Sequence, residues 1–564
     1  MLRGLTNYST LQRRPITSFG GLQRGEETEV NEFSDMQGMS GSGRGTLSSC
    51  GALKKAAAAV GTGQVLAVEN GSSMDFYSLG EGGFYKNGTL LPLKQFGLGT
   101  SIGVPSGRME EVKARCQELG LPVEISVTSY GYLDSTWIGD YQKTKLVRYG
   151  NFVIAVPQML ITDGINTYFW KGHFFLMQDY QYYSDLELYY PGLTGIDGLF
   201  PDGEAITVRL NGHEFLTGYT KVDPDKTMMR KLVPEGKTGS GGGGKALAEV
   251  LRPGMVNFTD VTHAYNRMFG VSGNRIYASK QGDIHNFNYY KLTPLDSWWA
   301  DTESGEDFTA LTSLSGRVVA FKKMSTYEVY GVNAPYTVKD VSRSFGCVNP
   351  FTVAEVAGVL VLQTKEGLHA YGGSRFVNIQ YPLGDLLPEA DAMACGTGSK
   401  YYIVMAGRLY CYDYYRGAWY CVSGETPAGL CTCAGGVFIN LNGTLWQLPE
   451  SDSPAPASQE TKEQPWYFET TAINRDFTEG LLSSVELKLA CEDASFTVWV
   501  SHDGGAYEKV QDVEWQQGKR FVAVPVRPRM CAEFRVKVAG SGRVTLCGMM
   551  LNQYKGGSVS LCSR

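Results

Sequence analysis

A glycine-rich segment with a lysine is the first place where the residue types suggest chemistry. Residues Gly239 to Ala246 read GSGGGGKA, which matches most of the phosphate-binding P-loop pattern. That pattern needs Ser or Thr after the lysine to bind magnesium, and it follows a buried strand. Here Ala246 follows Lys245, and the preceding RKLVPEGKT is not a buried strand. We therefore interpret the segment as a loop of an inserted unit and not as a nucleotide site.

A second candidate is the run SHDGG, Ser501 to Gly505. It is similar to the turn of a sialidase Asp-box, with Tyr507 in place of the usual tryptophan. Such turns are themselves structural, so the run predicts a β-hairpin.

Histidines and carboxylates give no clearer site. The acidic pairs Asp301 with Glu303 and Glu306 with Asp307 are candidates for the two carboxylates of a glycosidase, but charges beside turns are usually only solvated. No GxSxG nucleophile elbow stands in a strand-turn-helix context. No two of the six histidines have the HxH or HxxxH spacing of a zinc site: His173, His213, His263, His285, His369 and His502. We identify no catalytic, cofactor-binding or metal-binding residue and expect that the protein is not an enzyme.

Two pairs of adjacent aromatic residues remain as candidates for binding. Trp298-Trp299 and Tyr289-Tyr290 have ring faces on which sugars could stack. The alternative is that these rings pack between neighbouring strand units.

Composition limits the class of protein. The chain has 564 residues, 43% hydrophobic residues and a formal net charge of −6, which predicts a folded protein without the clustered basic residues of a DNA-coating protein. The 12 cysteines include no CxxC pair, and the N-terminal residues contain no apolar signal segment, so we expect reduced cysteines and folding in a cytosol. No apolar run approaches the ~20 residues of a membrane span.

A repeated strand pattern predicts the fold. From about residue 52, short apolar or aromatic runs alternate with turn signals, of which Asn87-Gly88 is a strong one for a two-residue hairpin. Tyrosine-rich, glycine-rich runs favour strands and tight turns. After residue 266 the units recur at a period of roughly 40 residues, which is typical of a β-propeller. We predict an all-β chain with a β-propeller of about seven blades.

The expected organisation has three parts. Residues 1–50 form an N-terminal arm, 51–465 the propeller, and 466–564 a C-terminal β-sandwich. Residues 186–256 are predicted to be a small inserted β unit, 106–120 a short amphipathic helix, and 451–465 a linker.

Three segments resemble a family of bacteriophage virion proteins. Residues 19–40 contain the family's glycine-rich start followed by "F-x-D-M-x-x-M-S". In residues 266–383 an "N-R-x-x-G" step leads to "I-Y-A-S-x-x-G-D". Residues 466–554 are similar to the family's terminal domain.

The resemblance implies a structural component of a phage tail, of the nozzle or tail-stabilisation type. Such a protein would form a homo-oligomeric ring near the head–tail connection, line part of the DNA exit channel and function in DNA ejection. Its implied partners are the portal, the adaptor and other tail proteins, with transient contact with exiting DNA and without a membrane span. Its implied location is the virion, assembled in the host bacterial cytoplasm. An acidic inner surface would let DNA pass without sticking.

Two alternatives stay open. The first is a receptor- or carbohydrate-binding tail component, which uses exposed aromatics such as Trp298. The second is a propeller enzyme that acts on cell-wall glycans.

Overall fold

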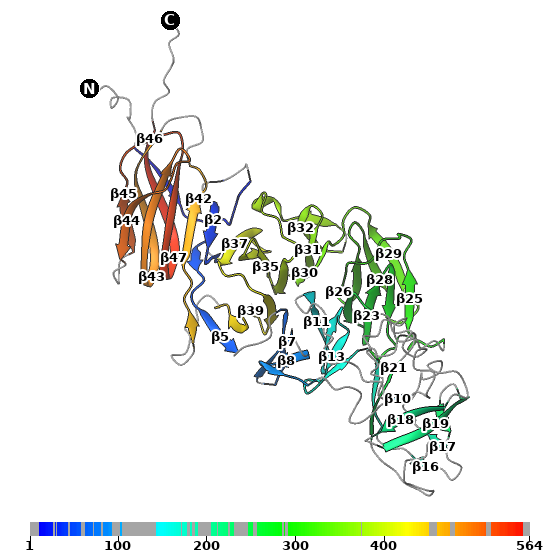
Figure 1. The fold of residues 1–564 in the computed structure, drawn as a ribbon. Coiled ribbons are helices and arrows are strands. Elements are labelled where there is room, and N and C mark those ends of the chain that lie inside the picture. Colours follow the sequence, from blue (N-terminus) through cyan, green and yellow to red (C-terminus); the bar gives the residue numbers. More distant parts are fainter. Residues whose placement is uncertain are drawn as a thin grey trace, which may run out of the picture. The chain divides into compact units, whose positions relative to one another are not determined.

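A computed structural model describes residues 11–92, 143–170, 257–449, 460–473, 480–514 and 520–555, with gaps at 26–28, 30, 43–44, 58–62, 72, 81–82, 285–286, 288–291 and 374. Elsewhere it describes strands between residues 102 and 251. The described part is all-β (Figure 1) and includes one short 3₁₀ helix, η2 (Tyr381–Leu383). In that part no helix is long and apolar enough to cross a membrane.

Four sheets of four antiparallel strands lie between residues 65 and 342. They are β6 (Val65–Asn70), β7 (Ser73–Gly80), β8 (Gly83–Lys86) and β9 (Thr89–Leu90); β11 (Lys145–Tyr149), β12 (Phe152–Val156), β13 (Leu160–Thr162) and β14 (Thr167–Phe169); β22 (Asp260–Ala264), β23 (Arg267–Ser272), β24 (Arg275–Ala278) and β25 (Trp298–Asp301); and β26 (Ala310–Leu314), β27 (Arg317–Phe321), β28 (Thr326–Tyr330) and β29 (Thr337–Ser342).

Three further sheets complete a seven-bladed β-propeller, which confirms the predicted fold class. They are β30 (Asn349–Val356), β31 (Val359–Thr364), β32 (Gly367–Tyr371) and β33 (Phe376–Asn378); β34 (Met393–Thr397), β35 (Lys400–Met405), β36 (Arg408–Asp413) and β37 (Ala418–Ser423); and β38 (Gly429–Cys433), β39 (Gly436–Leu441), β40 (Thr444–Gln447), β5 (Leu53–Ala57) and β41 (Thr461–Lys462).

The last blade is built from both ends of the repeat. Strand β5 pairs with β40 and also with β41, so a strand at residues 53–57 lies between strands from residues 444–447 and 461–462. The two ends of the repeat therefore cannot separate unless β5 loses its pairing with β40 and β41.

Two-residue turns join consecutive strands, which explains why short apolar runs alternate with turn residues in the sequence. Asn87 (φ 50°) and Gly88 (φ 80°) join β8 to β9, as the sequence predicts. Ala357-Gly358 and Asn442-Gly443 join strands in the same way, with both φ angles positive. Turns of this kind match the twist of the flanking strands and favour Asn and Gly.

The first strand of each blade is the innermost one. In the first four blades β6 contacts β11, β11 contacts β22, and β22 contacts β26. A buried ion pair joins three of these strands: Lys145 Nζ lies 2.7 Å from Asp260 Oδ1 and donates to Leu311 O at 2.8 Å. Asp260 also accepts the backbone N–H of Leu311 at 2.7 Å.

The C-terminal part is a ten-stranded sheet that contains the N-terminal residues (Figure 1). Strands β43 and β47 pair along almost their whole length, and register shifts between them bend the sheet around its core. The strands are β1 (Leu11–Ile16), β2 (Phe33–Gln37), β3 (Met39–Gly41), β4 (Leu47–Ser49), β42 (Trp466–Thr470), β43 (Gly480–His502), β44 (Glu508–Glu514), β45 (Phe521–Pro525), β46 (Met530–Cys531) and β47 (Phe534–Lys555).

This topology differs from the expected division into an arm and a sandwich. Strand β2 pairs with β42, while β1 and β4 pair with β47. Residues 11–49 are thus part of the C-terminal sheet, because their backbone groups complete its hydrogen-bonding ladder.

Apart from the blade of β11 to β14, eight described strands between residues 102 and 251 form two small sheets. These strands are β10 (Ile102–Gly103), β15 (Gly172–Met177), β16 (Gln181–Tyr182), β17 (Glu187–Tyr189), β18 (Ala205–Leu210), β19 (His213–Asp223), β20 (Lys226–Arg230) and β21 (Ala246–Leu251). The predicted inserted unit at 186–256 includes five of them. The helix expected at 106–120 and most of the linker expected at 451–465 lie outside the described residues.

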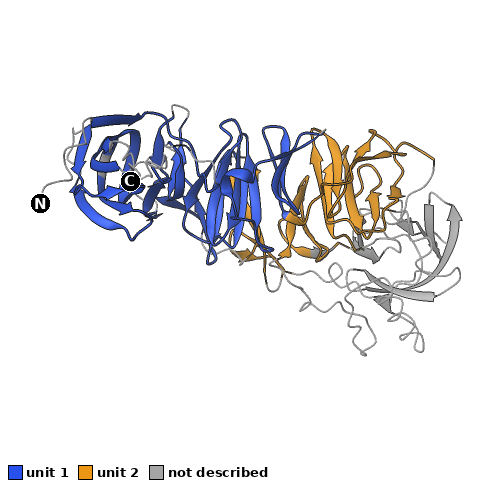
Figure 2. Cartoon of the chain, turned by 90° about the horizontal axis from the view of Figure 1, so that it is seen from above, with its two compact units in different colours: residues 1–58, 351–564 blue, residues 59–350 orange. Residues whose placement is uncertain are grey.

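By its contacts the chain divides into two compact units (Figure 2): residues 1–58 with 351–564, and residues 59–350. In the first unit one continuous core joins buried side chains of residues 16–53, of the blades and of the C-terminal sheet. The second unit has three described clusters of buried side chains along its blades.

Candidate functional site

Of the two glycine-containing motifs, one forms a turn and the other lies almost entirely outside the described residues. The segment that begins at Gly239 is not described before Ala246, the first residue of β21. The Ser501–Gly505 run joins β43 to β44, which confirms the predicted hairpin. Asp503 Oδ1 accepts the N–H groups of Ala532 and Glu533 at 2.7 and 3.1 Å, so its carboxylate holds the turn.

The histidines in the described part of the chain lie on different strands. The five in described strands lie one each on β15, β19, β22, β32 and β43, while His285 lies outside the described residues. Throughout the described ranges, no three His, Cys, Asp or Glu side chains are grouped so that they could hold a metal ion.

Of the four carboxylates considered as glycosidase-type pairs, one is ion-paired with an arginine and three are exposed. Asp301 forms a two-pronged ion pair with Arg275, at 2.7 Å from Nε and 2.8 Å from Nη2. This hydrogen bonding lowers the pKa of Asp301 and raises that of Arg275. Glu303, Glu306 and Asp307 are exposed on the segment that follows β25.

The arm contributes buried side chains to the core of the C-terminal sheet. Phe33, Met36 and Met39, all within the phage-like segment 19–40, are at most 1% exposed. The ring of Phe33 stacks on Phe19 at 6.0 Å between centroids and meets the edge of Phe468 at 5.4 Å. These side chains attach the arm to β42 by apolar contact.

A polar junction lies beside this apolar contact and joins three elements. Asp35 on β2 accepts hydrogen bonds from Arg408 on β36, at 3.2 Å, and from the hydroxyl of Tyr467 on β42, at 2.7 Å. Arg408 also donates to the Tyr467 oxygen at 2.9 Å. Burial and the bond to Asp35 raise the pKa of Tyr467, so the phenol stays protonated and donates to the carboxylate. The arm, a blade and the C-terminal sheet therefore share one hydrogen-bonded triad.

Glycines allow the arm to approach these elements closely. A Cβ on Gly21 would collide with the carbonyl oxygen of Trp419 and lie 2.8 Å from its nitrogen. Gly38 has φ +63°, and a Cβ there would lie 2.6 Å from the oxygen of Pro465. Gly21 and Gly38 are thus required by close backbone contact.

The second phage-like segment contains a buried arginine that holds a loop. Arg267 is 0% exposed, and its guanidinium donates to the carbonyls of Ser279 at 2.6 Å, Pro294 at 2.5 Å and Asp296 at 2.5 Å. Desolvation lowers its pKa. Arg267, from the "N-R-x-x-G" step, therefore binds the backbone of Ser279, from the "I-Y-A-S" step, and holds the two steps together.

The glycine of the same motif makes room for an aromatic ring. A Cβ on Gly270 would collide with the ring of Phe258, which is fully buried. Phe258 in turn packs against Trp170 at 5.7 Å and Tyr277 at 5.8 Å between centroids.

The paired tryptophans point in opposite directions because they are neighbours on β25. Trp298 is partly buried and meets the edge of Tyr336 at 5.2 Å, within the core between blades. Trp299 is 45% exposed, and the guanidinium of Arg275 lies 4.1 Å from its ring centroid. The sequence reasoning named Trp298 as the residue to test for sugar stacking, whereas the structure exposes Trp299. Tyr289 and Tyr290 lie outside the described residues.

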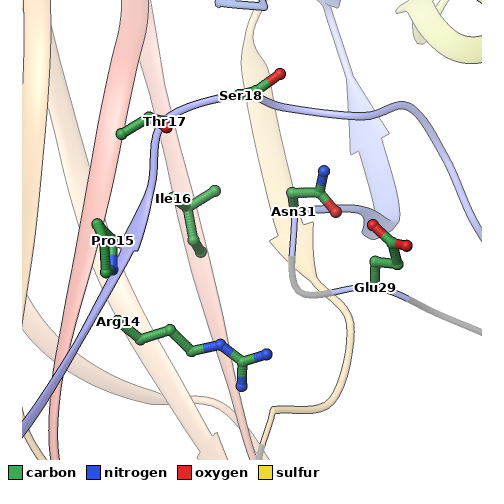
Figure 3. A pocket seen from close by; sticks show the side chains of 7 residues that line it. All are labelled: Arg14, Pro15, Ile16, Thr17, Ser18, Glu29 and Asn31. Carbon is green, nitrogen blue, oxygen red and sulfur yellow. The ribbon is translucent and has the colours of Figure 1, made fainter.

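A groove of about 550 Å³ lies within the arm, between residues 14–18 on one side and Glu29 with Asn31 on the other (Figure 3). Arg14, Ile16 and Ser18 belong to one side, and Glu29 and Asn31 to the other. Apart from Ile16 these residues are exposed or half-buried, so the groove has no buried polar group to orient a ligand.

The innermost strands of the first four blades do not form an acidic surface. They carry two carboxylates, Glu69 and Asp260, and two permanent cations, Lys145 and Arg148. Because Lys145 and Asp260 pair with each other, little net charge remains there.

Comparison with known proteins identifies no family for this chain. No family model and no curated protein matches the chain. Among solved structures, the exo-β-1,3-galactanase of Phanerochaete chrysosporium with galactose is 8% identical, with 88% of this chain and 100% of that chain covered and a TM-score of 0.21. Trypanosoma rangeli sialidase in complex with sialic acid is also 8% identical, over 96% and 95% of the two chains, with a TM-score of 0.21. Likenesses at this level carry no argument about what this chain binds.

Proposed function

We propose that this protein is a structural component of a bacteriophage tail, in the nozzle or close to the head–tail connection. The observation that supports this most is the use made of the phage-like segment 19–40. Its aromatic and methionine side chains are buried, its glycines allow backbone contact, and Asp35 joins three elements. The residues that carry the resemblance are therefore architectural, as expected of an assembly protein.

In this proposal the protein acts as a ring of identical subunits, since phage tails have rotational symmetry. DNA would pass through the lumen of the ring and not through the centre of one propeller. The balanced charges of the inner strands agree with that distinction, because Lys145 and Asp260 there bind each other. The portal, adaptor and other tail proteins would bind the faces of the ring.

The proposal is tested with the purified full-length chain. Light scattering coupled to size exclusion, followed by negative-stain microscopy, should show closed rings of one symmetry. Immunogold labelling of virions with an antibody against the chain should mark the tail below the portal. A stable monomer that binds host cells and is absent from particles would contradict it.

The alternative, a carbohydrate-binding tail component, is favoured by one specific observation. Trp299 presents an exposed indole beside a charged pair. This role does not require a ring, so binding in a persistent monomer would separate it from the structural role.

A further inference from the structure

Four side chains form a small platform on one face of the third blade. Arg275 lies directly opposite Asp301, and Tyr277 lies opposite Trp299, in the antiparallel pairing of β24 and β25. Because directly opposed residues point to the same side of a sheet, all four share one face. We call Arg275, Tyr277, Trp299 and Asp301 the Trp299 platform.

The indole of Trp299 is held in place from one side. The Arg275 guanidinium lies 4.1 Å from the indole centroid and 5.9 Å from that of Tyr277. Its own orientation is fixed by the two hydrogen bonds to Asp301, at 2.7 and 2.8 Å. A guanidinium with this two-pronged pairing is preorganised and stacks well on aromatic rings. The platform is thus rigid before any ligand arrives.

The platform is also exposed. Trp299 keeps 45% of its surface in solvent, and the side chains of Arg275 and Asp301 are 35% and 46% exposed. An indole that is exposed and already held in one orientation can accept the flat apolar face of a ligand with little loss of side-chain freedom.

The charges of the platform define the kind of ligand. Arg275 and Asp301 neutralise each other, so the surface offers no net charge to an anion or a cation. It offers a flat apolar ring next to hydrogen-bonding groups, because the carboxylate oxygens of Asp301 accept more than one bond.

We propose that the Trp299 platform binds a neutral hexopyranose unit of a surface glycan. The apolar C–H face of the sugar packs on the indole, and its hydroxyls bond to Arg275 and Asp301. The proposal rests on the carbohydrate-binding alternative and specifies its ligand, and a ring-forming structural protein does not need the site.

The test uses the full-length chain and four named probes. Cellotetraose, galactotetraose, tetra-N-acetylchitotetraose and the anionic tetragalacturonate are titrated while tryptophan fluorescence and saturation-transfer NMR are recorded. At least one neutral probe should bind at millimolar concentration or below. Trp299→Ala should weaken that binding about tenfold, which corresponds to ~1.4 kcal/mol, and Arg275→Gln should weaken it in the same direction.

Two matched variants serve as controls. Tyr415→Ala removes another exposed aromatic ring, which is 78% exposed between β36 and β37, and Trp298→Phe keeps an aromatic ring against Tyr336. Both should bind the neutral probe like the unmodified chain. Circular dichroism and the thermal midpoint should be the same for Trp299→Ala as for the unmodified chain.

Several outcomes would overturn the site. These are no binding of any neutral probe at millimolar concentration, unchanged binding by both platform variants, or stronger binding of tetragalacturonate than of every neutral probe. If Trp299→Ala abolishes ring formation, the platform is a subunit contact and the saccharide site is rejected. Ring formation by an unmodified chain that binds no sugar would leave the structural proposal intact.

Discussion

Arg267, which is fully buried, and Lys145, which is partly buried, have different partners. Arg267 is surrounded by backbone carbonyls, which hold a loop in place. Lys145 pairs with Asp260, whose side chain is 1% exposed. Removal of one member of a buried pair leaves an uncompensated charge, so the second arrangement makes stability depend on pH.

The variant Lys145→Met tests this dependence. Burial raises the pKa of Asp260, and Lys145 opposes that rise, so the pKa should rise further in the variant. A carboxyl with a raised pKa in the folded state loses stability as pH rises through that pKa. The variant should therefore lose about 3 kcal/mol at pH 8 and less at pH 5, measured by urea unfolding.

An exposed ion pair is the control for that measurement. Arg343 lies 2.6 Å from Asp340, but its side chain is 79% exposed. Arg343→Met should shift the urea midpoint little at either pH, since exposed pairs contribute less than about 1 kcal/mol. Equal losses at pH 5 and pH 8 in Lys145→Met would contradict the assigned role of Asp260.

His502 is a buried polar residue whose imidazole makes no hydrogen bond within the described part of the chain. It is 9% exposed, and neither ring nitrogen has a hydrogen-bond partner in the described part of the chain. His502→Leu should raise the free energy of unfolding by about 1 kcal/mol, because an unsatisfied polar group is replaced by an apolar one. Differential scanning fluorimetry would show this as a higher melting temperature.

His369 provides the matched comparison. It is 3% exposed, and its Nδ1 lies 3.1 Å from Thr364 Oγ1. His369→Leu should lower stability, because the variant loses the buried hydrogen bond between the imidazole and Thr364. A decrease for both variants would show that His502 has a stabilising interaction after all.

At the scale of elements, the arm depends on close backbone contact. The N–H of Leu22 donates to the oxygen of Trp419 at 2.7 Å, next to the position where Gly21 leaves no space for a Cβ. The arm can therefore lie against β37 only with glycine at residue 21.

Gly21→Ala should displace the arm from β37. We expect a loss of about 1–3 kcal/mol, as for other overpacked sites, and faster cleavage of the arm in limited proteolysis. Gly398→Ala is the control, since a Cβ there meets nothing within 4 Å. Arm cleavage at the same rate in both variants would show that this contact does not hold the arm.

At the scale of the whole molecule, the first residues complete the last domain. Phe33, Met36, Met39 and Leu47 are at most 1% exposed, and their core includes side chains of the C-terminal sheet. Each contributes roughly 2 kcal/mol on burial, so together they approach the ~5–15 kcal/mol stability of a typical domain.

A chain that lacks residues 1–50 should therefore fail to fold its C-terminal sheet. Mass spectrometry after limited proteolysis should show cleavage within residues 466–555, while fragments from residues 59–350 persist. A chain that lacks residues 1–15 is the control, because residues 11–15 of β1 are exposed and the buried Ile16 is kept. Equal protection of the C-terminal sheet in both shortened chains would contradict this dependence.

The phage-like motifs show how far sequence reasoning extends to the candidate site. The sequence singled out Asn266-Arg267 and the segment 19–40 by resemblance, but it contained no signal that Arg267 holds residues 279–296 or that Asp35 meets Arg408. It also could not decide between Trp298 and Trp299. Neighbours on a strand point to opposite faces, and only the surrounding blades decide which face is buried.

By itself the sequence determined the repeat of short strands, the approximate number of blades and turns such as Asn87-Gly88, because these follow from local periodicity and backbone preference. The tertiary structure alone decided that β5 completes the last blade and that β1, β2 and β4 join the C-terminal sheet. Those pairings join residues about 400 or more positions apart, as in Ser34 Oγ to Thr470 O. No local pattern encodes them, since a strand's composition does not identify which distant edge its backbone will pair with.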